Sequence, residues 1–493
     1  MKENKTNKFG DMPADEFRKF GHELIDWAAD YIENVETYPV LSQVNPGEIK
    51  NQLPVSPPAN PESMEDIIYD FKKIITPGIT HWNHPNFMAY FNSSASMPGI
   101  LAELLISTFN VNGMIWKTSP AATELEQLTL NWFRQMLGLD EGWWGIIYDC
   151  ASVTSMHAIA AARENINLNI LEKGMRGRTD LPRLSLYTSE HAHSSIEKGA
   201  VTLGIGLDSV RKISVDNKFR MIPDKLERAI KEDKKKGWIP FCVVATVGTT
   251  SSTSIDPVDE IADICKREKL WLHVDAAHGG VAAMLSEKKH IFTGIEKADS
   301  LVVNPHKWMF TPLDLSVFFT KKPEILKRAF SLVHEYLRTK EDTSVENYMD
   351  YGVPLGRRFR SLKLWFIIRY FGVDGIRNRI REHIRIANET AAKIDEHPMF
   401  ERMAPVPFST ICFRAHPPKI NDEAKLEQLN INLMNKINET GKLFLSHTKL
   451  NYKFVIRMTI GSIRTNENHV LKAWELIQRT LKIILDEKQT DYL

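Results

Sequence analysis

The chain of 493 residues is poor in cysteine, and its cysteines form no recognisable cluster. Cys150, Cys242, Cys265 and Cys412 are scattered along the sequence, and none belongs to a CxxC motif. A disulfide framework or a zinc site requires cysteines at close, characteristic spacings. We therefore expect no bound metal and a reducing, cytoplasmic environment for this protein.

The sequence also lacks an excess of charge of either sign and a long apolar run. Lys and Arg number 63 and Asp and Glu number 62, so we expect neither nucleic acid nor a membrane as a partner. No run reaches the roughly 18 apolar residues of a membrane-spanning helix. The polar first residues lack the apolar core of a secretory signal. The hydrophobic content of 43% is typical of a globular protein, here of two or three domains.

Residues 15–35 have the periodicity of an amphipathic helix. Apolar side chains recur there every three or four positions, at Phe17, Phe20, Leu24, Trp27, Tyr31 and Val35. A proline-rich stretch at 54–61 separates this helix from the rest of the chain. The apolar stripe packs either on its own chain or against a second subunit, and both interpretations stay open. We assign 1–95 to an N-terminal helical segment for dimerisation.

Between about residues 140 and 320, short apolar runs alternate with helical segments. Four runs rich in Val, Leu and Ile are expected to be strands, at 184–188, 241–247, 270–277 and 300–305. This alternation predicts an α/β fold with a mostly parallel central sheet covered by helices. The ligand site of such a sheet lies beyond the carboxyl ends of its strands.

The C-terminal part of the chain contains a polar segment between two helical ones. Residues 323–332 and 361–393 have helical periodicity, whereas the stretch at about 333–352 has none, which is typical of a lid. After residue 394, strand and helix patterns alternate again. We predict a large α/β domain at 96–375, which includes the lid as a mobile catalytic loop, and a small α+β domain at 376–493.

Four reactive or polar residues follow the expected strands. Lys307, Asp275, His193 and Thr250 stand near the carboxyl ends of these strands, so a parallel sheet would bring them to one edge. A lysine there can form an imine with an aldehyde, and an aspartate can keep a pyridinium nitrogen protonated. Alone, each residue has an ordinary explanation as a surface charge, a helix cap or part of a turn. Their joint order indicates a site for an aldehyde cofactor.

The start of a helix can hold the phosphate of such a cofactor. Ala151 and Ser152 stand at the beginning of a helical pattern, where free backbone N–H groups bind anions. Ser152 adds a hydroxyl group, although a serine there is also an ordinary helix cap.

Sequence motifs over nearly the whole chain strengthen this interpretation. They are THW at 80–82, TELE at 123–126, AHSS at 192–195, HVDAA at 273–277, NPHKW at 304–308 and PLGRRFR at 354–360. Together they resemble the pyridoxal phosphate-dependent group II decarboxylases, and within them the aromatic-L-amino-acid decarboxylase branch. The resemblance implies fold type I, the aspartate-aminotransferase-like fold, and a homodimer with its active site at the subunit interface.

The resemblance also implies a role for each residue around pyridoxal phosphate. Lys307 would hold the cofactor as a Schiff base, and Asp275 would bind its ring nitrogen. The other implied positions are His193 and Ala277 on the two ring faces, Thr250 near the ring, His306 as a support for substrate and cofactor, and Ala151, Ser152 and Asn304 at the phosphate.

Tyr348 carries the expectation about the type of reaction. It matches a loop tyrosine that, in the family, protonates the substrate Cα after CO2 leaves. Relatives that act as aldehyde synthases usually differ at this tyrosine or at the stacking histidine, here His193. The resemblance therefore favours plain decarboxylation of aromatic L-amino acids. An aldehyde synthase and a non-catalytic protein that binds the cofactor stay as alternatives.

The expected substrate pocket is aromatic and roomy. Trp82, Tyr90 and Phe91 would line it, although all three could also be ordinary core residues. Gly356 stands where relatives that accept indole or catechol rings have glycine, and where histidine and plant tyrosine decarboxylases often have serine. Asn112 stands where an apolar residue is expected, and its amide is a candidate partner for a ring hydroxyl.

Overall fold

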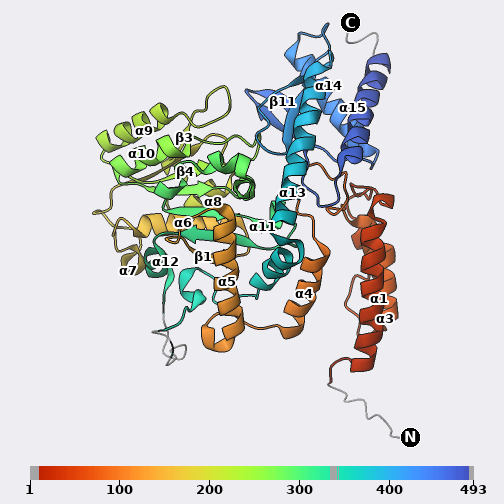
Figure 1. Cartoon of the computed structure of the whole chain (residues 1–493), viewed down its shortest axis with the longest axis horizontal. Coiled ribbons are helices and arrows are strands. Elements are labelled where there is room, and N and C mark those ends of the chain that lie inside the picture. The colour runs from red at the N-terminus through yellow and green to blue at the C-terminus, as the bar shows by residue number, and fades with distance from the viewer. Residues whose placement is uncertain (1–9, 333–340, 342–343, 488–493) are drawn as a thin grey trace.

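The computed structural model describes residues 10–332, 341 and 344–487 of the chain. In these residues a large α/β body carries a small C-terminal unit at one end and N-terminal helices along one side (Figure 1). None of the described helices is both long enough and apolar enough to cross a membrane.

The large sheet has seven strands in the order β1-β7-β6-β5-β4-β2-β3. Neighbours from β3 to β6 are parallel, whereas β7 is antiparallel to both β6 and β1. This arrangement confirms the expected mostly parallel sheet, and the four expected strands are β2, β4, β5 and β6. The bounds are β1 Trp144–Tyr148, β2 Leu184–Ser189, β3 Val210–Ile213, β4 Ile239–Thr246, β5 Trp271–Asp275, β6 Ser300–Val303 and β7 Ser316–Thr320.

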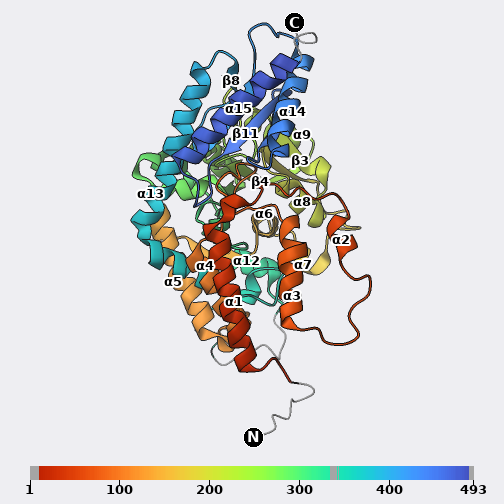
Figure 2. The same cartoon turned by 90° about the vertical axis from the view of Figure 1, so that its right-hand side faces the viewer.

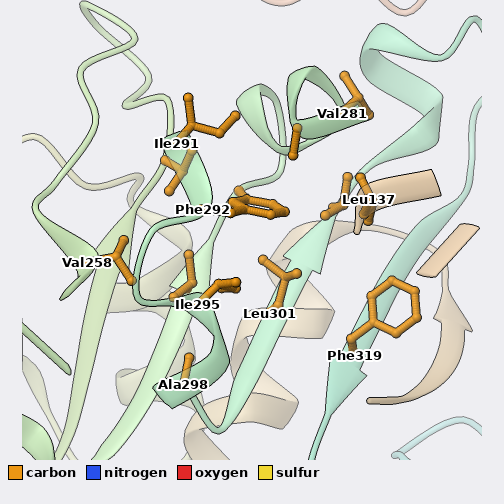
Figure 3. Close-up of a cluster of buried hydrophobic side chains, with 14 of the residues drawn as sticks. Leu137, Val258, Val281, Ile291, Phe292, Ile295, Ala298, Leu301 and Phe319 are labelled. Carbon is orange, nitrogen blue, oxygen red and sulfur yellow. The ribbon is translucent and has the colours of Figure 1, made fainter. Parts of the chain in front are cut away.

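Helices cover both faces of this sheet, because successive strand residues point to opposite sides. On β4, Val243 belongs to one hydrophobic cluster and the next residue, Val244, to the other. Figure 3 shows part of the first cluster, with Leu301 and Phe319 projecting from neighbouring strands. Helices of the first cluster include α5 (Pro120–Leu137), α9 (Pro223–Lys235), α10 (Val258–Glu268) and α13 (Ser361–Glu396), and those of the second include α6 (Ala151–Glu164), α8 (Ser195–Thr202) and α12 (Pro323–Phe330).

The C-terminal unit is an antiparallel sheet in the order β10-β11-β9-β8, covered by two helices. Its elements are β8 (Phe400–Arg402), β9 (Thr410–Ala415), α14 (Glu423–Glu439), β10 (Ser446–Leu450), β11 (Lys453–Thr459) and α15 (Glu467–Glu487).

A long helix, α13 (Ser361–Glu396), connects the two sheets and is interrupted at Gly372, where φ is 64°. Ile384 still belongs to the core of the large sheet, whereas Ile386 belongs to the core of the small one. The two cores therefore meet inside this helix, somewhat after the expected boundary at residue 375.

The N-terminal helices α1 (Ala14–Glu33) and α3 (Met64–Asp70) lie side by side along the large body (Figures 1 and 2). Ion pairs connect the two helices, such as the one between Nζ of Lys19 in α1 and Oε1 of Glu65 in α3 at 2.5 Å. The expected amphipathic helix is present. Of its apolar stripe this chain buries Phe20 and Val35, whereas Phe17 and Leu24 are 61% and 38% exposed. The segment also contains the short helix α2 (Glu48–Gln52), and α4 (Met97–Phe109) follows the segment.

Candidate active site at the edge of the large sheet

The structure brings Asp275, Ala277, Asn304 and Lys307 together at the carboxyl ends of β5 and β6. Asp275 ends β5, and its Oδ1 accepts a hydrogen bond of 3.1 Å from the backbone N–H of Ala277. The backbone N–H of Asn304 donates to the carbonyl of Ala277 at 3.1 Å. Lys307 follows in the short helix α11 (Pro305–Trp308). These contacts arise because neighbouring parallel strands end at the same edge.

Lys307 has the environment of a lysine that can react as a neutral amine. Burial lowers its pKa below the ordinary value, and the opposite charge of Asp275 counteracts part of this effect. Its Nζ lies 5.2 Å from the ring centre of Phe91. A lysine whose pKa is lowered in this way loses its proton more easily and can attack a carbonyl carbon.

His193 belongs to the same electrostatic neighbourhood. Its side chain is open to solvent, yet the surrounding atoms remove enough water to lower its pKa below the ordinary value. Asp275 raises this pKa and Lys307 lowers it, so the three side chains lie within range of one another. Nδ1 of His193 accepts the backbone N–H of Ser195 at 3.2 Å, which helps to hold the ring.

The start of α6 provides the expected place for a phosphate. The helix begins at Ala151, directly after β1, and the Ser152 side chain in its first turn is exposed. Asn304 is 1% exposed, and its amide is bound to the hydroxyl of Ser316 at 2.7 Å. Free N–H groups at the start of a 14-residue helix are suited to an anion.

Phe91 lies beside Lys307 and also contacts two side chains to which the sequence assigned no role. Its ring stacks on His278 at 3.8 Å, and the guanidinium of Arg457 lies 5.3 Å from its ring centre. His278 directly follows the HVDAA motif at 273–277, and this position is the signal in the sequence that could have found it. Arg457 comes from β11 of the small sheet, and no local pattern connects it with the site. The small unit therefore contributes directly to this edge.

Thr250 lies on an exposed turn after β4, and its neighbour Ser251 is held by the small sheet. The carbonyl of Ser251 accepts from Nε of Arg457 at 2.8 Å and from the thiol of Cys412 at 3.3 Å. The hydroxyl of Thr448 donates to that of Ser251 at 2.8 Å. Docking of the small sheet therefore determines where Thr250 lies.

Tyr348 does not lie on an open lid over Lys307, contrary to the expectation. It begins a short 3-10 turn at Tyr348–Tyr351 and is 2% exposed. Its ring lies 6.0 Å from that of Trp144, at the beginning of β1, whereas the site lies at the other end of the sheet. Within one chain, residues 344–351 are therefore packed away from Lys307, and the role of Tyr348 stays a prediction; the other part of the expected lid, 333–340 and 342–343, lies outside the described residues.

The expected substrate residues form three separate groups. Phe91 is at the site, but Trp82 contacts Tyr90 at 6.1 Å and Phe87 at 4.2 Å in a different aromatic cluster. In the third group Asn112 lies beside Gly356, where a side-chain carbon would be 3.6 Å from the Asn112 amide. Within the described residues of one chain these groups lie apart, and their expected place in one substrate pocket stays a prediction.

His306 is held by its neighbours and does not face an open site. It is 4% exposed, its Nδ1 accepts the backbone N–H of Leu315 at 2.9 Å, and its Nε2 lies 3.3 Å from the Asn304 amide. Burial lowers its pKa to about 3, so the ring is neutral at pH 7. This arrangement suits a support for Asn304 and Lys307.

The donor set fits pyridoxal phosphate. It combines an amine with a lowered pKa, a buried carboxylate, an imidazole beside them and a helix start that can bind an anion. The described residues hold no cluster of three or more metal-ligating side chains. An aldehyde cofactor that carries a ring nitrogen and a phosphate would use each of these groups.

Comparisons with known proteins agree with this donor set. Residues 46–416 match the family model described as the pyridoxal-dependent decarboxylase conserved domain. The chain is 40% identical to tryptophan decarboxylase 2 of Oryza sativa subsp. japonica, over 95% of each chain. It is 39% identical to tyrosine decarboxylase 2 of Narcissus pseudonarcissus, over 96% of this chain and 95% of that one. A phenylacetaldehyde synthase of Arabidopsis thaliana is 38% identical, over 96% and 97%.

Solved structures give the same result for the fold. The structure of Oryza sativa TDC with PLP and tryptamine superimposes with a TM-score of 0.93 at 34% identity, covering 97% of this chain and 99% of that one. Catharanthus roseus tryptophan decarboxylase in complex with L-tryptophan gives a TM-score of 0.91 at 36% identity, covering 97% and 100%.

Proposed function

Because this chain belongs to the pyridoxal-dependent decarboxylase family, in its aromatic amino acid branch, and uses pyridoxal phosphate, we propose a specific reaction for it. It converts aromatic L-amino acids into the corresponding arylalkylamine and CO2. The observation that carries the proposal is the half-buried Lys307 beside Asp275 and His193, with the Phe91 ring next to its Nζ. The candidate substrates are tryptophan, 5-hydroxytryptophan, phenylalanine, tyrosine and DOPA.

In this proposal each residue acts on a definite part of the cofactor. Lys307 binds the aldehyde carbon covalently, and its lowered pKa supplies the neutral amine for this bond. Asp275 pairs with the ring nitrogen and keeps it protonated. His193 and Ala277 hold the two faces of the ring. The start of α6 at Ala151 and Ser152, together with Asn304, holds the phosphate.

Bound pyridoxal phosphate supplies a conjugated ring that accepts the electron pair left on Cα when the carboxylate departs. The negative charge of Asp275 stabilises the protonated nitrogen that attracts this pair. Phe91 offers an aromatic face beside Lys307 for an aromatic substrate. A proton must then reach Cα, and within its own chain Tyr348 is buried beside Trp144, away from Lys307.

An aldehyde synthase is the second candidate, because the relatives include a phenylacetaldehyde synthase. That activity would release an aldehyde, ammonia and hydrogen peroxide in place of the amine. His193, the residue at which such enzymes are expected to differ, favours the amine. Tyr348 no longer discriminates between the two activities, since it lies in the core.

We further propose that the chain acts as a homodimer with the active site at the interface. Apolar side chains of α1 and α4 remain uncovered, and a second copy would bury them. The exposed ones are Phe17, Leu24 and Ile25 of α1, and Met97, Leu101, Leu104, Leu105 and Phe109 of α4. Sedimentation should give twice the chain mass of 56.5 kDa. A monomer at working concentration would contradict this proposal.

The reaction is tested by identifying its products. Purified protein with pyridoxal phosphate is incubated with each aromatic L-amino acid, and products are identified by mass together with a peroxide assay. Amines without peroxide are expected, whereas aldehydes with peroxide would establish the synthase. Lys307→Ala is the control, because it should abolish both the products and the Schiff-base absorbance. An unchanged absorbance in Lys307→Ala would refute the assignment of this lysine.

A further inference from the structure

A chain of buried hydrogen bonds connects the neighbour of Lys307 with the start of α6. His306 contacts Asn304 at 3.3 Å, Asn304 contacts Ser316 at 2.7 Å, and Ser316 contacts Thr154 at 2.9 Å. The hydroxyl of Thr154 continues to the carbonyl of Cys150 at 3.1 Å. Ser316 and Thr154 are both completely buried. No part of the proposed reaction assigns a role to these two hydroxyls.

The position of the proton on the His306 imidazole decides which group donates in each of these hydrogen bonds. Nδ1 of His306 accepts the backbone N–H of Leu315 at 2.9 Å, so this nitrogen carries no proton. Burial keeps the imidazole neutral at pH 7, with a pKa of about 3. A neutral imidazole has one N–H group, and here it must be on Nε2. Nε2 is therefore a donor.

A donor at Nε2 requires an acceptor from Asn304. An asparagine amide keeps its shape when its oxygen and nitrogen exchange places, so the neighbours determine its orientation. With the Asn304 nitrogen towards His306, two donors would face each other at 3.3 Å. With the oxygen towards His306, the amide nitrogen donates to Ser316 instead.

The amide and hydroxyl protons of Asn304, Ser316 and Thr154 then have a single possible arrangement. The structure draws the amide with Oδ1 accepting from Ser316 and Nδ2 facing His306. With the amide turned over, Ser316 accepts from Asn304 and donates to Thr154, and Thr154 donates to the carbonyl of Cys150. Each side chain in this row of hydrogen bonds passes one proton to the next group, which fixes a single arrangement. The second amide proton of Asn304 takes no part in this row.

We propose that His306 is the Nε2–H tautomer, and that Ser316 and Thr154 are positioning residues that align Asn304 with the first turn of α6. This inference rests on the proposed function in that Asn304 and α6 hold the cofactor phosphate. The hydroxyl of Thr154 sets the geometry of the phosphate site, and it does not touch the reacting atoms.

The affinity of the apoenzyme for pyridoxal phosphate tests this inference, measured by absorbance without any amino acid. Thr154→Val and Ser316→Ala should each weaken binding about tenfold, which corresponds to about 1.4 kcal/mol. Thr154→Ser should restore the affinity to within about twofold, because it returns the hydroxyl. An unchanged affinity in both Thr154→Val and Ser316→Ala would overturn the inference.

Ser155→Ala is the matched control on the same helix. Ser155 is also completely buried, but its hydroxyl makes no hydrogen bond in the described residues. Its removal should leave the affinity unchanged. Equal weakening in Ser155→Ala and Thr154→Val would show that the effect is general loosening of α6, and the inference would fail.

The tautomer is tested directly by nitrogen NMR of 15N-histidine apoenzyme, with the His306 signals assigned from their loss in His306→Asn. A protonated Nε2 and an unprotonated Nδ1 are expected, and the reverse would refute the assignment. Neither the affinity measurement nor the NMR measurement requires catalytic turnover. A protein that releases aldehyde, or no product, would refute the proposed function and leave this inference standing.

Discussion

Arg357→Met is expected to destabilise the protein strongly, because it leaves a buried carboxylate without its cation. Nη2 of Arg357 lies 2.7 Å from Oε1 of Glu126 and 2.9 Å from the carbonyl of Ile147. The two charged side chains are only 8% and 4% exposed. Breaking a buried pair from one side costs about 3–5 kcal/mol. Methionine keeps most of the apolar stem, so the electrostatic loss dominates.

A double variant, Glu126→Gln with Arg357→Met, separates the effect of charge on stability from the effect of packing. Glu126 also accepts the backbone N–H of Ile147 at 2.9 Å, and glutamine keeps this acceptor. Glu126→Gln combined with Arg357→Met leaves no unpaired charge, so it should recover most of the lost stability. Arg381→Met is the matched surface control, because Arg381 and Glu287 also lie 2.7 Å apart but are 46% and 45% exposed. It should cost less than about 1 kcal/mol.

Equilibrium unfolding in urea, followed by tryptophan fluorescence, measures all four proteins. The expected order is wild type and Arg381→Met most stable, the double variant next, and Arg357→Met least stable. If Arg357→Met cost no more than Arg381→Met, burial of the pair would not have the energetic effect that we assign to it.

Three further predictions concern the product, the substrate and pH. Tyr348→Phe should still release amine, because its ring packs in the core, and aldehyde in the product mass spectrum would show that Tyr348 reaches Cα. Gly356→Ser should lower kcat/KM for tryptophan more than for tyrosine, since it fills space beside Asn112, and an unchanged ratio would remove Gly356 from the pocket. Buried histidines have pKa values lowered to about 3–4, so the unfolded chain binds more protons below about pH 6.5. The melting temperature of the apoenzyme should therefore fall as pH is lowered from 7 to 5, with each group contributing about 1 kcal/mol per pH unit below 6.5, and a flat profile would contradict this. These histidines are His84, His157, His273, His306 and His383.

The sequence alone determined the central sheet and the identity of its reactive edge. Each expected strand is a short apolar run between helical segments, and this local pattern is sufficient to predict parallel strands. Asp275 and Lys307 follow such runs directly, so their meeting depends only on where the strands end. Strands β1 and β7 were not predicted, because β1 follows a helix closely and β7 returns antiparallel at one side of the sheet.

Only the tertiary structure decided what surrounds this edge. Arg457 and Phe91 are far apart in sequence, and they meet because the segment before Phe91 hydrogen-bonds to the small unit, where the carbonyl of Met88 accepts from the backbone N–H of Thr459 at 2.8 Å. Tyr348 has the local sequence of a polar loop, yet its ring is buried beside Trp144. Side-chain packing between distant segments has no local periodicity, so it leaves no pattern to recognise. The same holds for the proton order from His306 to Thr154, which depends on contacts among residues 154, 304, 306, 315 and 316 that only the folded chain brings together.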